Sequence, residues 1–210
     1  MTQPFNPPLT AIALNATLKR GDDKHPSSTE RILRYLETHL APYDVTTEHI
    51  RLSEFNIEPG VTSLESDRDD WPRIREKIIN ADILIFGSPI WLGQPSSICK
   101  RVLERMDAFL SETDDHNRMP SYGRIAVVAV VGNEDGAHLV SSQLYQALND
   151  VGFTIPANGV TYWVGEAMQS TNFVDLAEVP ETVASATKML AANCAHLARL
   201  LKNAPYPGSG

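Results

Sequence analysis

The chain has 210 residues, of which 42% are hydrophobic and 21% are charged, as in an ordinary globular protein with a full core. The formal net charge is -8 and no run of Lys and Arg occurs, so the electrostatic footprint of a nucleic-acid-binding protein is missing. No apolar run approaches the ~20 residues of a membrane span, and the N-terminus does not resemble a signal peptide. We expect one cytoplasmic domain over residues 1–210, with no nucleic-acid or membrane partner and with flexible ends at residues 1–8 and 204–210.

Two cysteines occur, Cys99 and Cys194, each within an apolar helical pattern. A disulfide framework or a zinc site needs more ligands at closer spacing. We therefore expect both cysteines to be small core residues, and we expect no metal site.

The first half of the chain alternates between apolar runs and amphipathic patterns. Residues 9–14, 45–52 and 81–86 predict strands, the second of them more polar and nearer a sheet edge. Apolar residues at three- and four-residue spacing predict helices over residues 27–40, which open with hydroxyl cap candidates, and over 71–79.

The second half continues the alternation. Residues 98–109 predict a helix, residues 125–131 a strand that is apolar throughout, and residues 140–151 another helix. A fifth strand is predicted at residues 153–155, and a final helix at about 179–201.

Two stretches have no regular pattern. Residues 53–69 are acidic and irregular, and residues 156–178 form a long predicted loop that contains Trp163. An apolar side chain in such a segment predicts a lid, an oligomer contact or ordinary packing.

Strands that alternate with helices predict a parallel sheet covered on both faces, an α/β/α arrangement of three layers. Right-handed crossovers make this sheet doubly wound, with the strand order 2-1-3-4-5. Ligands of such sheets bind at the carboxyl ends of the strands, beside strands 1 and 3. The loops after strands 1, 3 and 4 are therefore the candidate site.

The loop after the first strand has hydroxyl side chains at both ends and Lys19-Arg20 between them, and a helix N-terminus follows. This combination can bind a phosphate dianion without a metal, although it also fits a capped helix after a polar loop. Neither G-x-x-x-x-G-K-[ST] nor G-x-G-x-x-G is present, so a triphosphate P-loop or a Rossmann site has no support. The candidate phosphate ligands are Thr17, Lys19, Ser27, Ser28 and Thr29.

The loop over residues 87–95 places apolar side chains where a connector is usually polar. Such residues suit a flat, partly apolar ring, and they also fit a loop folded onto the core. The candidates are Pro89, Ile90, Trp91, Leu92 and Gly93.

The loop after the fourth strand brackets polar residues between two glycines. Its acidic side chains also fit a favourable charge at a helix N-terminus. The candidates are Gly132, Asn133, Glu134 and Gly136.

Together the three loops resemble those of the flavodoxin-like NAD(P)H-dependent FMN reductase family, over nearly the whole chain. Members carry N-[GAC]-[ST]-x-[RK] and then Ser and Thr before the first helix, a proline-aromatic-glycine loop after strand 3, and an Asp-Arg-like helix end. The matching segments here are Asn15-Ala16-Thr17-Leu18-Lys19, Ser27-Ser28-Thr29, Pro89-Ile90-Trp91-Leu92-Gly93 and Arg105-Met106-Asp107. Residues 20–26 are an insertion relative to compact members, and the T-x-T-G-x-T loop of flavodoxins is absent, which favours the reductase branch.

The resemblance implies a flavodoxin-like fold with FMN bound by the candidate residues above. It also implies that NADH or NADPH passes hydride through FMN to a small-molecule acceptor such as a quinone or a free flavin, with no side chain acting as catalytic acid, base or nucleophile. A homodimer or homotetramer is implied as well. Two alternatives remain: a flavodoxin-type electron carrier, and a flavin-free regulatory or interaction domain.

Overall fold

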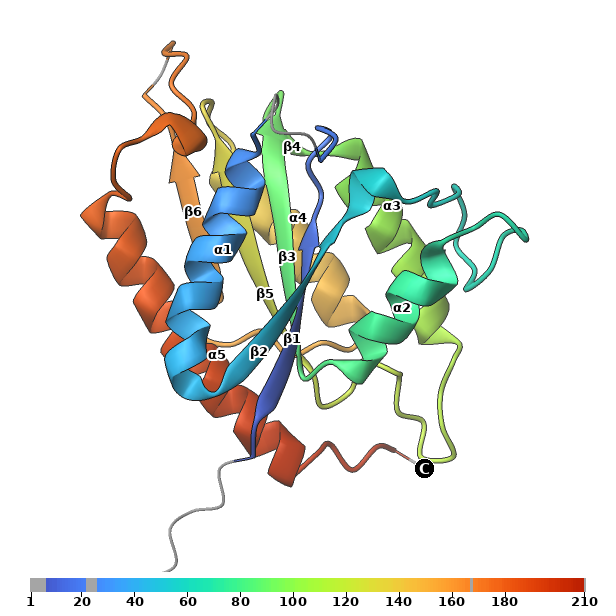
Figure 1. The fold of residues 1–210 in the computed structure, drawn as a ribbon. Coiled ribbons are helices and arrows are strands. Elements are labelled where there is room, and N and C mark those ends of the chain that lie inside the picture. Colours follow the sequence, from blue (N-terminus) through green and yellow to red (C-terminus); the bar gives the residue numbers. More distant parts are fainter. Residues whose placement is uncertain (1–6, 22–25, 167, 210) are drawn as a thin grey trace, which may run out of the picture.

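The computed structural model describes residues 7–21, 26–166 and 168–209. Five parallel strands form the sheet, in the order β2-β1-β3-β5-β6 (Figure 1). A short strand, β4, pairs antiparallel with the end of β3. Counted over the parallel strands alone, this is the predicted order 2-1-3-4-5. The strands are β1 (Leu9–Asn15), β2 (Val45–Arg51), β3 (Ile83–Trp91), β4 (Gln94–Pro95), β5 (Ile125–Gly132) and β6 (Val160–Val164).

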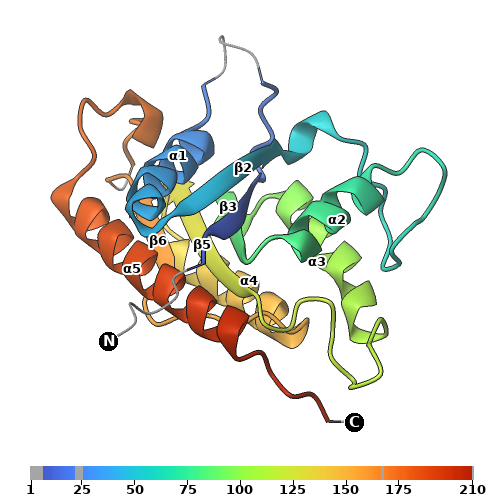
Figure 2. The same ribbon diagram turned by 60° about the horizontal axis from the view of Figure 1, so that its bottom comes forward.

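Helices cover both faces of the sheet, as predicted (Figure 2). One face carries α1 and α5, and the other carries α2, α3 and α4. Their bounds are α1 (Ser28–Leu40), α2 (Trp71–Asn80), α3 (Ser97–Met106), α4 (Ala137–Asp150) and α5 (Glu181–Asn203). The described residues also form four short 3-10 helices: η1 (Ala41–Tyr43), η2 (Leu52–Glu54), η3 (Asp107–Leu110) and η4 (Phe173–Asp175).

The core divides into two clusters because successive strand residues point to opposite faces. In β1, Ile12 and Leu14 pack in the cluster that includes α2, α3 and α4, whereas Ala11 and Ala13 pack in the cluster with α1 and α5. Each fully buried Ile or Leu contributes ~1.5–3 kcal/mol. The sheet is therefore stabilised from both sides, and its carboxyl edge stays open to the loops.

The prediction of the fifth strand was wrong in position. Residues 153–155 make a single bridge to Ile125, and the regular strand is β6, inside the segment predicted as a loop. Asn158, at a left-handed φ of 56°, lies in the turn after which the chain runs along β5. Trp163 is consequently a strand residue, and its ring packs on Phe173 with the ring centroids 5.6 Å apart.

The third strand is longer than predicted. The segment 87–95, expected to be a loop, continues β3 as far as Trp91 and then turns back through β4. Ser88 is fully buried within it, because residues here still pair with β5. The apolar residues of this segment thus begin as part of the sheet and end in a β-hairpin.

Both cysteines are buried, as expected, and burial raises the pKa of the Cys99 thiol to about 12. Near the C-terminus, the Tyr206 hydroxyl lies 2.9 Å from the hydroxyl of Thr154, and the Ser209 N–H donates to the His116 carbonyl. Within the described part of the chain, every helix is too short or too polar to cross a membrane.

Candidate functional site

A cavity of about 120 Å³ lies at the carboxyl ends of β1, β3 and β5, where the sequence predicted a site. The first and second loops, the end of β5 and the segment around η4 meet there. Its lining consists of Thr17, Lys19, Ser28, Thr29, Pro89, Ile90, Trp91, Val131, Gly132, Asn133, Asn172 and Phe173.

The loop after β1 is curled by its own side chains. The Asn15 side-chain oxygen accepts the N–H of Thr17 (3.1 Å), and the Thr17 hydroxyl accepts the N–H of Lys19 (3.3 Å). The Lys19 ammonium donates to the carbonyl of Pro26 (3.0 Å) and so ties the two ends of the loop together. Of the predicted insertion, residues 22–25 lie outside the described residues.

The start of α1 supplies the hydrogen-bond donors of the cavity. Ser27 is the N-cap, and its hydroxyl accepts the N–H of Glu30 at 3.2 Å. Among the described residues, no acceptor is within hydrogen-bonding range of the N–H groups of Ser28 and Thr29. These groups lie at the positive end of the helix dipole, where they can bind an anion.

The β3–β4 hairpin is fixed by the loop after β5. At its tip Leu92 and Gly93 have φ values of 51° and 74°. The N–H of Leu92 donates to the Glu134 carboxylate at 2.9 Å. A Cβ at Gly136 would come within 2.9 Å of Gly93, so only glycine permits this approach. The hairpin is therefore held rigidly beside the cavity, with Trp91 on its lining.

A further wall comes from the segment 172–176, which local sequence patterns do not predict. The Asn133 side chain donates to the side-chain oxygen of Asn172 (3.3 Å), and Phe173 is completely buried beneath. The Ser28 hydroxyl accepts the N–H of Val174 at 3.1 Å. The polar dipeptide before Phe173 gave no signal by itself, because nothing in the sequence places it beside α1.

The structure thus gathers most of the predicted site residues around one cavity. Ser27 instead caps α1 and lines a neighbouring cavity. Leu92, Gly93, Glu134 and Gly136 do not line the small cavity but form the hairpin and its support.

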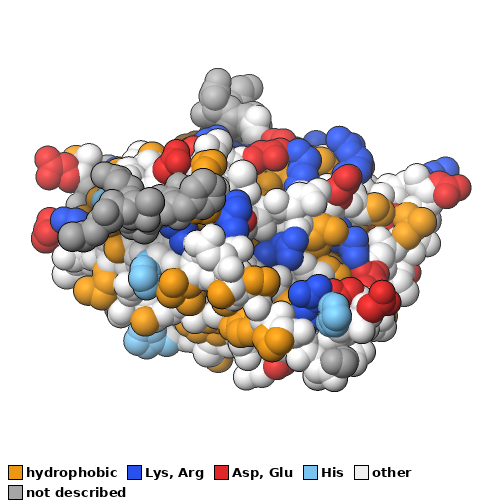
Figure 3. All heavy atoms as spheres, turned by 90° about the horizontal axis from the view of Figure 1, so that it is seen from below, with side chains coloured by type: hydrophobic (Ala, Val, Ile, Leu, Met, Phe, Trp, Pro, Cys, Tyr) orange, Lys and Arg blue, Asp and Glu red, His pale blue; other side chains and the backbone are white. Residues whose placement is uncertain are grey.

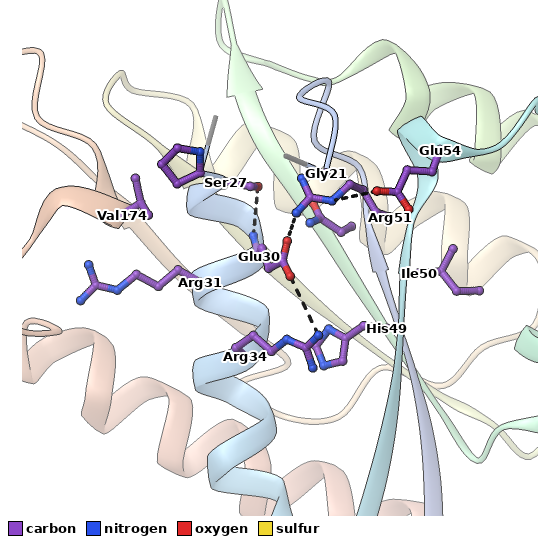
Figure 4. A pocket seen from close by; sticks show the side chains of 12 residues that line it. Gly21, Ser27, Glu30, Arg31, Arg34, His49, Ile50, Arg51, Glu54 and Val174 are labelled. Atoms are coloured by element: carbon purple, nitrogen blue, oxygen red, sulfur yellow. Dashed lines mark hydrogen bonds and ion pairs between the residues drawn. The ribbon is translucent and has the colours of Figure 1, made fainter. Parts of the chain in front are cut away.

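The neighbouring cavity is larger, about 600 Å³, and lies between α1 and the end of β2 (Figure 4). Its charges are largely compensated. Arg51 pairs with Glu30 and Glu54, and Arg34 pairs with Glu37. Because cations and carboxylates alternate here, the cavity offers an anion little net attraction.

The opposite end of the molecule also carries many basic side chains (Figure 3). Arg118 pairs with Asp114 at 2.8 Å and holds the pKa of that carboxyl at about 2, and Arg75 pairs with Glu112. The small cavity at the sheet edge differs from these two regions in that the N-terminus of a helix opens into it.

Comparisons with known proteins identify the family of this chain. A sequence model of the NADPH-dependent FMN reductase family matches residues 11–169. The 8-demethyl-8-aminoriboflavin-5'-phosphate synthase of Streptomyces davaonensis is 29% identical over 208 residues, covering 94% of this chain and 80% of that protein. The crystal structure of RosB with the bound intermediate 8-demethyl-8-formylriboflavin-5'-phosphate superimposes with a TM-score of 0.83, over 95% of this chain and 82% of that one.

Two other proteins match over a shorter stretch or at lower identity. An FMN-dependent NADPH-azoreductase of Staphylococcus aureus is 30% identical over 122 residues, which are 56% of this chain and 57% of the azoreductase. An NADH:FMN oxidoreductase shares 18% identity and the fold, with a TM-score of 0.65 over 96% of this chain and 94% of that one. The chain therefore belongs to the NADPH-dependent FMN reductase family and is an FMN-dependent NAD(P)H oxidoreductase.

Proposed function

We propose that FMN binds with its phosphate at the start of α1 and its ring system along the β3–β4 hairpin. The observation that carries this proposal is the convergence at one cavity of the Thr17 hydroxyl with the N–H groups of Ser28 and Thr29, which have no partner among the described residues. An anion with several acceptor oxygens fits this donor set. The Lys19 ammonium, at the same cavity, adds positive charge.

The cavity is smaller than the ~300–1,000 Å³ of typical ligand pockets. In our proposal it takes the phosphate end, and the ring extends over its mouth against Trp91, whose side chain is 50% exposed. One face of the ring then stays open for NADH or NADPH and, in turn, for the acceptor. Bound FMN supplies reversible two-electron chemistry. The protein binds it, orients it and limits access to it.

The expected acceptor is a small planar molecule such as a quinone or a free flavin. We include azo compounds among the candidates, since the Staphylococcus aureus relative is an azoreductase. The purified protein should bind FMN more tightly than FAD, since none of the described residues that line the phosphate end is placed for an adenine half. Calorimetry with FMN, FAD and riboflavin tests this, together with NADPH oxidation in the presence of menadione. FAD affinity equal to that of FMN would contradict the placement of the phosphate.

Replacing Trp91 with alanine should weaken FMN about tenfold, because stacked aromatic pairs contribute roughly 0.5–1.5 kcal/mol beyond area burial. The apo-protein should keep its melting temperature, since the side chain is half exposed and not a core residue. Leu110→Ala removes a similarly exposed apolar side chain in η3, outside the lining of the cavity, and is the matched control. A large loss of apo stability with unchanged FMN affinity would assign Trp91 to packing.

A second candidate function follows from the similarity to RosB over 95% of this chain. In that case the flavin is the substrate, and the protein changes the ring covalently instead of reducing and reoxidising it. Mass spectrometry of FMN after aerobic incubation separates the two functions. Unchanged FMN together with steady NADPH oxidation supports the reductase, whereas a flavin of altered mass supports the modifying enzyme.

We also propose a homodimer in which a second copy packs beside the mouth of the site and leaves one face of the ring open. Trp91 and Leu92 on the hairpin and Leu139 on the first turn of α4 are all exposed apolar side chains. Exposed apolar residues grouped on one face are typical of interaction surfaces. Because its proposed donor is NAD(P)H, we place the protein in the cytoplasm. Sedimentation of the protein with and without FMN tests the oligomeric state.

A further inference from the structure

The wall segment 172–176 is attached to α1 at two points. The Ser28 hydroxyl accepts the N–H of Val174 (3.1 Å). One helical turn later, the Arg31 guanidinium donates to the carbonyls of Phe173 (2.6 Å) and Leu176 (2.7 Å) and lies 5.2 Å from the Phe173 ring centroid. Residues three apart on a helix share a face, so both side chains reach the same segment.

Arg31 differs in this respect from the other arginines near it. Figure 4 shows its side chain extending on the side of Val174, away from Arg51 and Glu54. Its two hydrogen-bond partners lie far from it in the sequence, at separations of 142 and 145 residues. Arg31 thus connects the first helix to the connection between β6 and α5.

Among the residues that the structure describes, the Ser28 hydroxyl accepts one hydrogen bond and donates none. A hydroxyl has one O–H to donate and two lone pairs to accept. One lone pair takes the Val174 N–H, so the O–H is available to an anion in the cavity that Ser28 lines. Hydrogen bonds in such a chain strengthen one another.

We propose that Arg31 is a positioning residue that couples binding of the FMN phosphate to closure of the 172–176 wall, through Ser28. The inference rests on the proposed placement of the phosphate. Arg31 holds the wall against α1, and the wall orients the Ser28 hydroxyl toward the phosphate. The coupling is reciprocal. If the closed wall raises the affinity for the phosphate by some factor, the bound phosphate must raise the equilibrium constant for wall closure by the same factor.

The test compares Arg31→Met with Arg34→Met. The first variant keeps an unbranched side chain but loses both hydrogen bonds to the wall. The second removes the same charge from the next turn, where Arg34 is exposed and contacts the carboxylates of Glu30 and Glu37 instead of the wall. We expect Arg31→Met to raise the FMN dissociation constant about tenfold, within the ~5–150-fold range of such couplings. Arg34→Met should change it less than about twofold, and Arg31→Lys should fall between the two.

Three further measurements distinguish positioning from a general loss of structure. Riboflavin lacks the phosphate, so its affinity should fall less than that of FMN in Arg31→Met. In the wild-type protein, FMN should slow hydrogen exchange at the Val174 amide at least about fivefold, and this protection should be lost in Arg31→Met. The double variant with Ser28→Ala should lose less FMN affinity than the two single losses combined, because the variants interrupt one chain of bonds.

Two outcomes would overturn the coupling while leaving the FMN site in place. One is an equal loss of affinity for FMN and riboflavin in Arg31→Met. The other is an Arg31→Met protein with unchanged FMN affinity and unchanged protection of Val174. Absence of FMN binding by the wild-type protein would remove the proposed site and the coupling together. A fall in apo melting temperature with parallel loss of both flavins would assign Arg31 a purely structural role and also overturn the inference.

Discussion

Ser28→Glu is expected to remove most FMN binding while α1 stays folded. The new carboxylate would lie where the phosphate is proposed to bind, so that like charges repel and the Ser28 hydroxyl is lost as a donor. Charge-assisted hydrogen bonds are worth about 1.5–3 kcal/mol each, and the expected loss of affinity is therefore roughly tenfold to thousandfold. Carboxylates are tolerated in the first turn of a helix, so the melting temperature of the apo-protein should change little. Fluorescence titration and circular dichroism measure the two effects.

Riboflavin and Ser28→Ala provide the controls for this variant. The alanine variant loses the hydroxyl without adding charge and should show a smaller loss. Riboflavin, which has no phosphate to repel, should keep most of its affinity for Ser28→Glu. A similar loss for both flavins would mean that the glutamate displaces the wall at Val174, and an unchanged FMN affinity would exclude Ser28 from the site.

Local patterns in the sequence predict much of the fold. The apolar runs of β1 and β5 and the three- to four-residue spacing in α1 and α3 each reflect burial in a covered parallel sheet. Given the predicted strand order, the rule that ligands bind at the carboxyl ends of parallel strands selects three loops as the candidate site. Two of them contribute side chains directly to the cavity, and the third contributes Gly132 and Asn133.

β6 was misplaced although its sequence carried a usable signal. Five consecutive residues, Val160–Val164, are β-branched or aromatic, a composition typical of strands. The preceding residues 153–155 were equally suggestive, but they make only a single bridge to Ile125, whereas all five residues of β6 pair with β5. Phe153 is buried in the core beyond the end of α4, whereas Thr161 faces α5 and bonds to the Thr187 hydroxyl at 2.7 Å.

The wall of the site was beyond the reach of local patterns. Its position depends on the contacts of Arg31 with Phe173 and Leu176, and on that of Ser28 with Val174. An arginine on an amphipathic helix is ordinarily a solvated residue, and no spacing rule joins it to carbonyls in a distant segment. Such pairings follow from the tertiary arrangement of α1 and the connection after β6.

The second large effect is expected at Arg105, which the sequence presented only as part of a helix end. Arg105 and Asp69 are a fully buried ion pair, with the charged atoms 2.6 Å apart. The guanidinium also donates to the carbonyls of Glu58 and Thr62, and so holds the acidic irregular stretch over α3. Burial raises the pKa of Asp69, but hydrogen bonds from Arg105 and from backbone N–H groups outweigh it and leave the pKa below its usual value.

Arg105→Met should destabilise the protein by about 3–5 kcal/mol at neutral pH, because it leaves the Asp69 carboxylate buried without its counter-ion. Urea unfolding followed by circular dichroism measures the loss. Lys100→Met is the matched control on the same helix, since Lys100 is 64% exposed in its side chain and pairs with Glu104 at the surface. That variant should stay within ~0.5 kcal/mol of the wild-type protein.

The pH dependence of this loss gives an independent check of its cause. In the wild-type protein the Asp69 pKa is depressed, so its contribution is complete above the unfolded pKa of ~3.9 and is lost as the pH falls through the folded value. In Arg105→Met the burial effect persists without the guanidinium, the pKa of Asp69 rises, and proton uptake relieves part of the penalty. The destabilisation should therefore be largest near pH 7 and smaller near pH 5. A loss below ~1 kcal/mol, or one that is equal at both pH values, would show that Asp69 does not depend on Arg105 for its charge.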